Sequence, residues 1–176
     1  MKKCLAWCLA ALCICAFCAC GTPAADSDFD DNVTLETPAG NAPNFVVMDQ
    51  NGQAVQLSDF VGKPVVINFW ATWCGYCKRE MPDFDTAYKA YPDVVFLMIN
   101  VTDGVHETRQ KADAYVASEG FSFAIYYDVS GSANTAYKVT GYPTTVFINA
   151  AGDVVSKEVG MISYAVLEQG IALITE

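Results

Sequence analysis

The sequence predicts an α/β fold over residues 42–176, with a central mixed sheet flanked by helices. Short apolar runs typical of strands alternate with stretches of helical spacing, and the pattern closes with a hairpin and a helix. The chain has 176 residues, which suffices for one domain with a full core but not for two substantial domains. Helices between strands favour parallel pairing and hairpins require antiparallel pairing, so the sheet should be mixed.

The predicted domain begins with a hairpin, a buried strand and a long helix. Residues 45–57 should form a β-hairpin around the turn dipeptide Asn51-Gly52. Residues 65–70 are a nearly continuous apolar run, as expected for a strand buried on both faces. Residues 74–91 should be helical, because large apolar side chains recur there at helical spacing. These side chains are Met81, Phe84, Tyr88 and Tyr91.

The middle of the domain continues the alternation of strands and helices. Residues 94–100 should form a second buried strand, followed by a polar-faced helix over residues 107–119. Gly120 is a good C-terminal stop for that helix. A third strand over residues 123–127 and a short helix over residues 132–139 complete this part.

The domain closes with a second hairpin and a last helix. Residues 144–149 and 154–159 should be its strands, joined by a turn at residues 150–152. Ser163 should cap the last helix. One side of that helix carries Tyr164, Leu167, Ile171 and Ile174.

The first 41 residues predict export. Residues 1–19 contain two lysines, an apolar run and a small residue, Ala19, directly before Cys20. This resembles a bacterial lipobox, so we expect a lipoprotein signal peptide at 1–19 and lipidation at Cys20. Residues 20–41 are acidic and poor in apolar side chains, which predicts a disordered tether. An uncleaved anchor and a soluble secreted product are alternatives, and each of them also exports the domain.

The charge balance excludes two classes of protein. The chain has 20 acidic and ten basic residues, and loss of residues 1–19 would change its net charge from −10 to −12. Nucleic-acid binding needs clustered basic residues, so it is excluded. After residue 20 no stretch approaches the roughly 18 apolar residues of a membrane span, which excludes a polytopic membrane protein.

Cys74 and Cys77 are the sharpest functional signal. Six of the eight cysteines lie in residues 4–20, so a chain lipidated at Cys20 keeps only this pair. The pair stands where a buried strand gives way to a helix. The helix N-terminus favours a thiolate, which predicts a lowered pKa and a nucleophilic role for Cys74. Cys77, one turn further on, could close a disulfide with Cys74 or resolve a mixed one.

Two other uses of the pair are disfavoured. A closed zinc site needs four ligands, and Cys20 and His106 are the only other cysteine and histidine that could contribute. A structural disulfide across three residues would constrain little of the unfolded chain. We therefore expect a redox-active disulfide between Cys74 and Cys77, with no metal and no other cofactor.

Three segments together resemble the thioredoxin fold. Residues 69–78, which read FWATWCGYCK, and the later Pro82 resemble its active-site motif and kinked helix. Residues 141–145, which read GYPTT, resemble the loop that carries its cis-proline, and Gly160 matches the glycine after the last strand.

This resemblance implies a docking surface for an extended substrate. Pro143 would face the disulfide and offer backbone hydrogen bonds to the substrate. The resemblance further implies substrate contacts for Trp73, Tyr76 and Tyr142.

Three further features resemble the membrane-tethered TlpA/ResA-type reductases, grouped with the AhpC/TSA-Redoxin branch. They are the N-terminal hairpin, the strand-helix insertion at residues 94–119 and the lipid anchor. Plain thioredoxins have a buried Asp where this chain has Asn68, which cannot transfer a proton. ResA-type enzymes have a glutamate at the spacing of Glu80 that tunes the cysteine pair. A carboxylate there could accept the Cys77 proton, although the dipole also favours an ordinary glutamate early in a helix.

The function implied is that of an exported, lipid-anchored thiol-disulfide oxidoreductase, extracytoplasmic on a bacterial cell membrane. It would reduce protein disulfides, as a monomer. The expected partners are a protein thiol or disulfide substrate and a membrane electron donor of the CcdA/DsbD type. The implied roles are cytochrome c maturation or electron supply to a secreted enzyme such as a methionine sulfoxide reductase.

Four alternatives remain. A disulfide-forming oxidase would use the same fold, because the sequence does not fix a potential that changes by about 30 mV per 1.4 kcal/mol. A thiol peroxidase is disfavoured, since Ile67 and Ala71 occupy the positions where peroxiredoxins need Pro and Thr or Ser. A copper-delivery module of the SCO type would need a longer cysteine spacing and a downstream histidine. A non-catalytic binding module would have no need of both cysteines and the proline.

Overall fold

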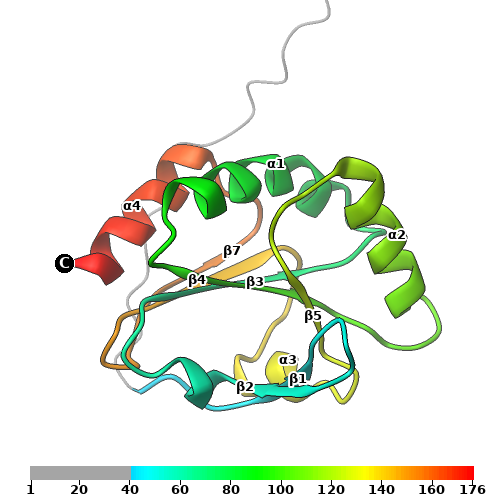
Figure 1. The fold of residues 1–176 in the computed structure, drawn as a ribbon, viewed down its shortest axis with the longest axis horizontal. Coiled ribbons are helices and arrows are strands. Elements are labelled where there is room, and N and C mark those ends of the chain that lie inside the picture. Colours follow the sequence, from blue (N-terminus) through cyan, green and yellow to red (C-terminus); the bar gives the residue numbers. More distant parts are fainter. Residues whose placement is uncertain (1–40) are drawn as a thin grey trace, which may run out of the picture.

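Seven strands form one sheet in the computed structural model, which describes residues 41–176 (Figure 1). The strands are β1 (Val46–Met48), β2 (Ala54–Gln56), β3 (Val65–Trp70), β4 (Val95–Asn100), β5 (Ile125–Tyr127), β6 (Thr144–Ile148) and β7 (Val154–Val159). The helices are α1 (Gly75–Ala90), α2 (Arg109–Glu119), α3 (Ser132–Ala136) and α4 (Tyr164–Thr175), with a short 3-10 helix, η1 (Leu57–Phe60).

The sheet is mixed, as predicted. Its strand order is β2-β1-β5-β4-β3-β6-β7. The three strands β3, β4 and β5 are parallel neighbours, and the hairpins β1–β2 and β6–β7 are antiparallel. The predicted α/β fold and the order of its elements are therefore confirmed, and several elements are shorter at their ends than the sequence suggests.

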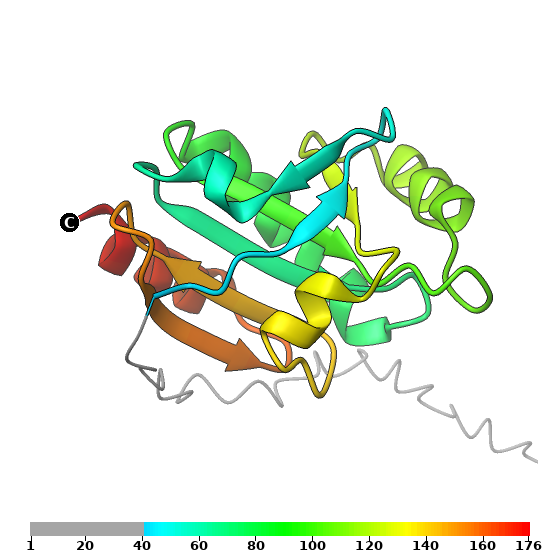
Figure 2. The same ribbon diagram turned by 90° about the horizontal axis from the view of Figure 1, so that it is seen from below.

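Alternation along β3 divides the core into two layers. All six residues of this strand are buried, which confirms the prediction of a strand buried on both faces. Val66 and Trp70 pack against the layer that contains α1, α2 and α4. Val65, Ile67 and Phe69 point the other way and pack with α3 and the β1–β2 hairpin. Figures 1 and 2 show these two layers on opposite sides of the sheet.

The apolar face of α1 differs from its prediction. Met81 and Phe84 are buried as expected, but the inner position of the next turn is taken by Ala87. Tyr88 is 37% exposed, and its ring contacts the edge of Phe96. The reason is geometric: three residues after Phe84 the helix again faces the sheet, while the fourth lies at the border of that face.

The N-terminus of α2 also differs from its prediction. The helix begins at Arg109, and Thr108 caps it by accepting a hydrogen bond from the backbone N–H of Lys111 at 3.3 Å. Residue 107, predicted as the first helical residue, is a buried glutamate in the preceding loop. At the other end Gly120 adopts a left-handed conformation, which confirms it as the stop.

One edge of the sheet collects the loops that make the site. Because β3, β4 and β5 are parallel, their C-terminal ends meet there, and they are followed by loops 71–74, 101–108 and 128–131. β6 is antiparallel to β3, so the loop that carries Pro143 reaches the same edge.

The predictions for the N-terminal segment lie outside the described residues. These are the signal peptide at 1–19, the lipidation site Cys20 and the tether at 20–41, of which only Asn41 is described. Asn41 forms a β-bridge with Asp153. Within residues 41–176, no helix has the length and apolar character required to cross a membrane.

Candidate active site

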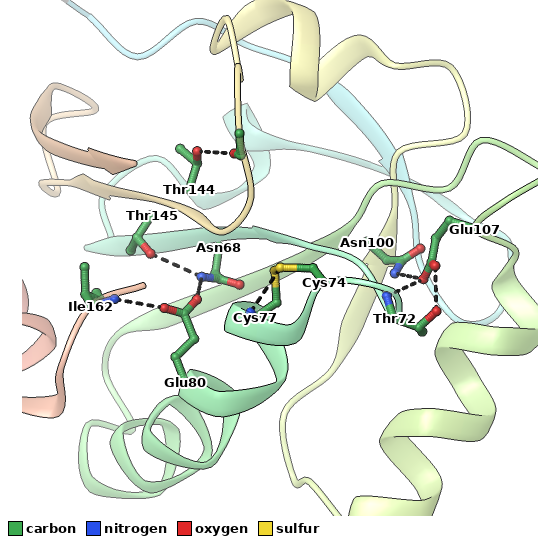
Figure 3. The surroundings of a disulfide bond; sticks show 11 residues. Asn68, Thr72, Cys74, Cys77, Glu80, Asn100, Glu107, Thr144, Thr145 and Ile162 are labelled. Atoms are coloured by element: carbon green, nitrogen blue, oxygen red, sulfur yellow. Dashed lines mark hydrogen bonds between the residues drawn. A yellow bond between two sulfur atoms is a disulfide. The ribbon is translucent and has the colours of Figure 1, made fainter. Parts of the chain in front are cut away.

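Cys74 and Cys77 form a disulfide at the N-terminus of α1, at the edge where β3 ends (Figure 3). Cys74 is the N-cap residue of this helix, and its Sγ accepts a hydrogen bond of 3.1 Å from the backbone N–H of Cys77. Cys77 is fully buried, whereas Cys74 retains 6% exposure. Cys74 is therefore the more accessible residue of the pair. After reduction, the helix N-terminus would favour its thiolate.

Glu80, one turn after Cys77 on α1, is almost completely buried. Its Oε1 accepts a hydrogen bond of 2.7 Å from Asn68 Nδ2, and its Oε2 accepts one of 3.1 Å from the backbone N–H of Ile162. Asn68 Nδ2 also donates to Thr145 Oγ1 at 3.1 Å. The Glu80 carboxyl group is therefore held by β3 and by the loop before α4, and Thr145 of β6 holds Asn68 in turn (Figure 3).

Burial raises the pKa of Glu80 from 4.5 to about 8, against the opposing effect of its two hydrogen bonds. The carboxyl group is thus mainly protonated at neutral pH, and its ionised fraction can accept a proton there. The Asn68 amide donates to Glu80 and so favours the ionised form of the carboxyl group. An aspartate at that position would place a second carboxylate beside the first.

Glu107 forms a second buried network that sequence reasoning missed. It is fully buried in the loop between β4 and α2. Its oxygens accept hydrogen bonds from the backbone N–H of Thr72 at 3.0 Å, the Thr72 hydroxyl at 2.7 Å and Asn100 Nδ2 at 2.6 Å. Thr108, an N-cap residue type, was the available signal that residue 107 precedes the helix.

Aromatic side chains surround the disulfide at the surface. Trp73 and Tyr76 are each 58% exposed. The Trp73 ring meets the Tyr142 ring edge to face, with centroids 5.7 Å apart. The peptide bond between Tyr142 and Pro143 is cis, as the resemblance implies. The structure thus brings Trp73, Tyr142 and Pro143 to one side of the site, whereas Tyr76 packs under the guanidinium of Arg79.

No group of His, Cys, Asp and Glu side chains suited to a metal ion occurs in residues 41–176. His106 is exposed, with 83% of its side chain accessible and Nδ1 3.3 Å from an Asp103 carboxylate oxygen. Cys20, the predicted lipidation site, is outside the described residues.

A disulfide at the N-terminus of the helix that follows the parallel strand β3, beside the loop of Pro143, defines a thioredoxin-fold thiol-disulfide oxidoreductase. Residues 38–157 match the model of the AhpC/TSA family, and the chain belongs to this family.

Its relatives carry names consistent with this chemistry. The chain is 35% identical over 134 residues to the thiol-disulfide oxidoreductase ResA of Bacillus subtilis, covering 76% of this chain and 74% of that one. A Chlorobium tepidum structure assigned as thiol:disulfide interchange protein DsbE aligns with a TM-score of 0.70 and 28% identity, over 80% and 99% of the two chains. The exposed lipoprotein thioredoxin of Streptococcus pneumoniae aligns with a TM-score of 0.62 and 30% identity, over 73% and 98%.

Proposed function

We propose that this protein reduces disulfides in exported proteins. The observation that carries the proposal is a cysteine pair at a helix N-terminus, with a buried carboxyl group one turn further along. The helix terminus favours the attacking thiolate of Cys74. Glu80, whose pKa is raised to about 8, supplies a group that can take up the proton of Cys77 near neutral pH.

The proposed reaction has two exchange steps. The Cys74 thiolate attacks one sulfur of the substrate disulfide, and the second substrate sulfur leaves as a thiolate that takes up a proton. Cys77 then loses its proton to the ionised form of Glu80 and attacks Cys74 Sγ. The mixed disulfide breaks, and the other substrate sulfur leaves as a thiolate, which takes up the proton now held by Glu80. The substrate gains two electrons and two protons, and the protein ends in the disulfide form of the structure.

We propose Trp73, Tyr76, Tyr142 and Pro143 as the substrate-binding residues. The first two are exposed beside Cys74, and the Trp73–Tyr142 contact places the proline loop next to the cysteine loop. A polypeptide that reaches Cys74 would therefore pass over aromatic surface. Aromatic side chains contribute large contact area at low entropic cost.

The proposal extends to the place of action, outside the cytoplasmic membrane and anchored to it by a lipid on Cys20. The export-like segment at 1–19 supports this, and so does the similarity to a pneumococcal protein that is named an exposed lipoprotein thioredoxin. A membrane protein of the CcdA/DsbD type would return electrons to the cysteine pair. The substrates would be apocytochrome c or a secreted enzyme such as a methionine sulfoxide reductase.

The test is the reduction potential of the Cys74–Cys77 pair, together with the rate at which the domain reduces insulin. We expect a potential near the roughly −270 mV of thioredoxin and catalysed reduction of insulin. A Cys77→Ser variant should stop at a mixed disulfide with the substrate. A potential near roughly −120 mV, with disulfide formation in a reduced protein, would instead identify an oxidase.

A further inference from the structure

The loop that carries Cys74 is tied to a neighbouring loop by the carboxylate of Glu107. Of its two partners, Thr72 lies two residues before Cys74, and Asn100 ends the adjacent strand β4. We infer that Glu107 is a positioning residue for thiol-disulfide exchange, which keeps the cysteine loop in register with the proline loop for a polypeptide substrate. This inference rests on the proposed function.

The Glu107 backbone is held by hydrogen bonds within its own loop. The carboxylate of Asp103 accepts hydrogen bonds from the backbone N–H groups of Val105, His106 and Glu107, at 2.7 to 2.9 Å. The Glu107 carbonyl in turn accepts a hydrogen bond of 2.9 Å from the N–H of Gly104. The loop is therefore closed on itself, which fixes the backbone from which Glu107 points toward Thr72 (Figure 3).

A buried carboxylate is costly unless donors surround it. Glu107 has three, and the salt bridges found in residues 41–176 do not include it. Two of the donors belong to Thr72, so most of the compensation for burying this group comes from the cysteine loop. Movement of Thr72 would leave the carboxylate short of donors, and the loop is held in place for that reason.

The position of Thr72 determines how two substrate-contacting loops face each other. Trp73 follows Thr72 directly, and its ring packs against Tyr142, the residue before Pro143. A polypeptide must contact both the Cys74 sulfur and the proline loop at once. A small disulfide needs only the sulfur. Loss of the Glu107 anchor should therefore harm exchange with proteins more than exchange with small molecules.

The test compares the rates of reduction of insulin and of hydroxyethyl disulfide. Glu107→Gln keeps the size of the side chain but presents one acceptor and an NH₂ group to three donors. We expect the second-order rate with insulin to fall about tenfold, the effect of losing a hydrogen bond to a charged group. The rate with hydroxyethyl disulfide should change less than about threefold. Thr72→Val, which removes only the hydroxyl, should give a smaller change in the same direction.

Asp113→Asn is the matched control. Asp113 lies on α2 and accepts a hydrogen bond from the Tyr127 hydroxyl, so this variant loosens a nearby contact without touching the cysteine loop. Non-additive effects in the Glu107→Gln, Thr72→Val double variant would further support the inference, because coupled residues share one interaction.

Three results would overturn the inference. The first is an insulin rate within about twofold of wild type in Glu107→Gln, or in Thr72→Val if the glutamine variant does not fold. The second is a parallel loss with both disulfides, and the third is the same selective loss in Asp113→Asn. If wild type oxidises reduced proteins and does not reduce insulin, the proposed direction of electron flow is wrong. The role of Glu107 is then tested by comparing the rates at which each variant oxidises a reduced protein and a small thiol.

Discussion

At the scale of single residues, Glu80 makes stability depend on pH. Its carboxyl group ionises near 4.5 in the unfolded chain and near 8 in the oxidised folded protein. Between these values the folded state retains a proton that the unfolded state has lost, so stability falls as pH rises. The stabilising contribution is complete below about pH 4.5 and lost above about pH 8.

Glu80→Gln should remove this dependence. From pH 5 to pH 8, the free energy of unfolding of wild type should decline relative to the variant by on the order of 3–4 kcal/mol, at 1.36 kcal/mol per pKa unit. Urea unfolding of the oxidised proteins at both pH values measures this decline. Glu119→Gln, an exposed change on α2, is the control and should follow wild type. Parallel pH profiles for Glu80→Gln and wild type would contradict the assigned burial effect.

The sequence predicts the burial of one of the two buried glutamates, Glu80, but not that of Glu107. Glu80 could be predicted as inward-facing, because its spacing from Cys77 and Phe84 places it on the buried side of α1. Its partners could not be predicted, because Ile162 lies 82 residues away along the chain. The buried position of Glu107 was not predicted. Its contacts depend on Thr72, 35 residues earlier in the chain, and on Asn100 at the end of β4.

At the scale of elements, the packing of α4 on β6 depends on one glycine. Gly170 is buried in the middle of α4, and a Cβ added there would lie 2.3 Å from ring atoms of Phe147. Phe147 is fully buried in β6, so its ring has little room to move. The close approach of helix and sheet therefore requires a residue without a side chain at this position.

Gly170→Ala should destabilise the protein despite the higher helix propensity of alanine. Propensity would favour alanine by about 1 kcal/mol, whereas overpacking costs about 1–3 kcal/mol. We expect a net loss of up to about 2 kcal/mol, read from the midpoint of urea unfolding at unchanged m-value. Leu173→Ala, on the exposed side of the same helix, should change stability by less than about 1 kcal/mol. A gain in stability for Gly170→Ala would show that the ring can move aside.

Element boundaries show the limit of local patterns. The end of α2 at Gly120 and the cap of α4 at Ser163 are found as predicted, because a single residue type encodes each of them. The inner face of α1 was only partly predicted. Helical spacing allows either Ala87 or Tyr88 to follow Phe84 on the inner face. The angle at which α1 packs on the sheet decides between them, so that Ala87 is buried and Tyr88 lies at the border of that face.

At the scale of the whole molecule, the proposed anchor makes a prediction about the full chain. Expressed in a bacterium, wild type should incorporate labelled palmitate and fractionate with membranes. Cys20→Ser should lose both properties, since two acyl chains give stable anchoring and a polypeptide without them has no such attachment. Cys18→Ser should retain both. Incorporation of palmitate by Cys20→Ser would contradict lipidation at this residue.

The sequence by itself determined the α/β fold, the order of its elements and the Cys74–Cys77 pair. These features depend on periodicity, on turn and cap residues and on spacings of a few residues, so each can be read within a short window. Only the tertiary structure decided which side chains surround the pair. Asn68 and Ile162 meet at Glu80, because β3 and the loop before α4 both lie against α1. Thr72 and Asn100 meet at Glu107, because the parallel strands β3 and β4 bring their C-terminal ends to one edge of the sheet.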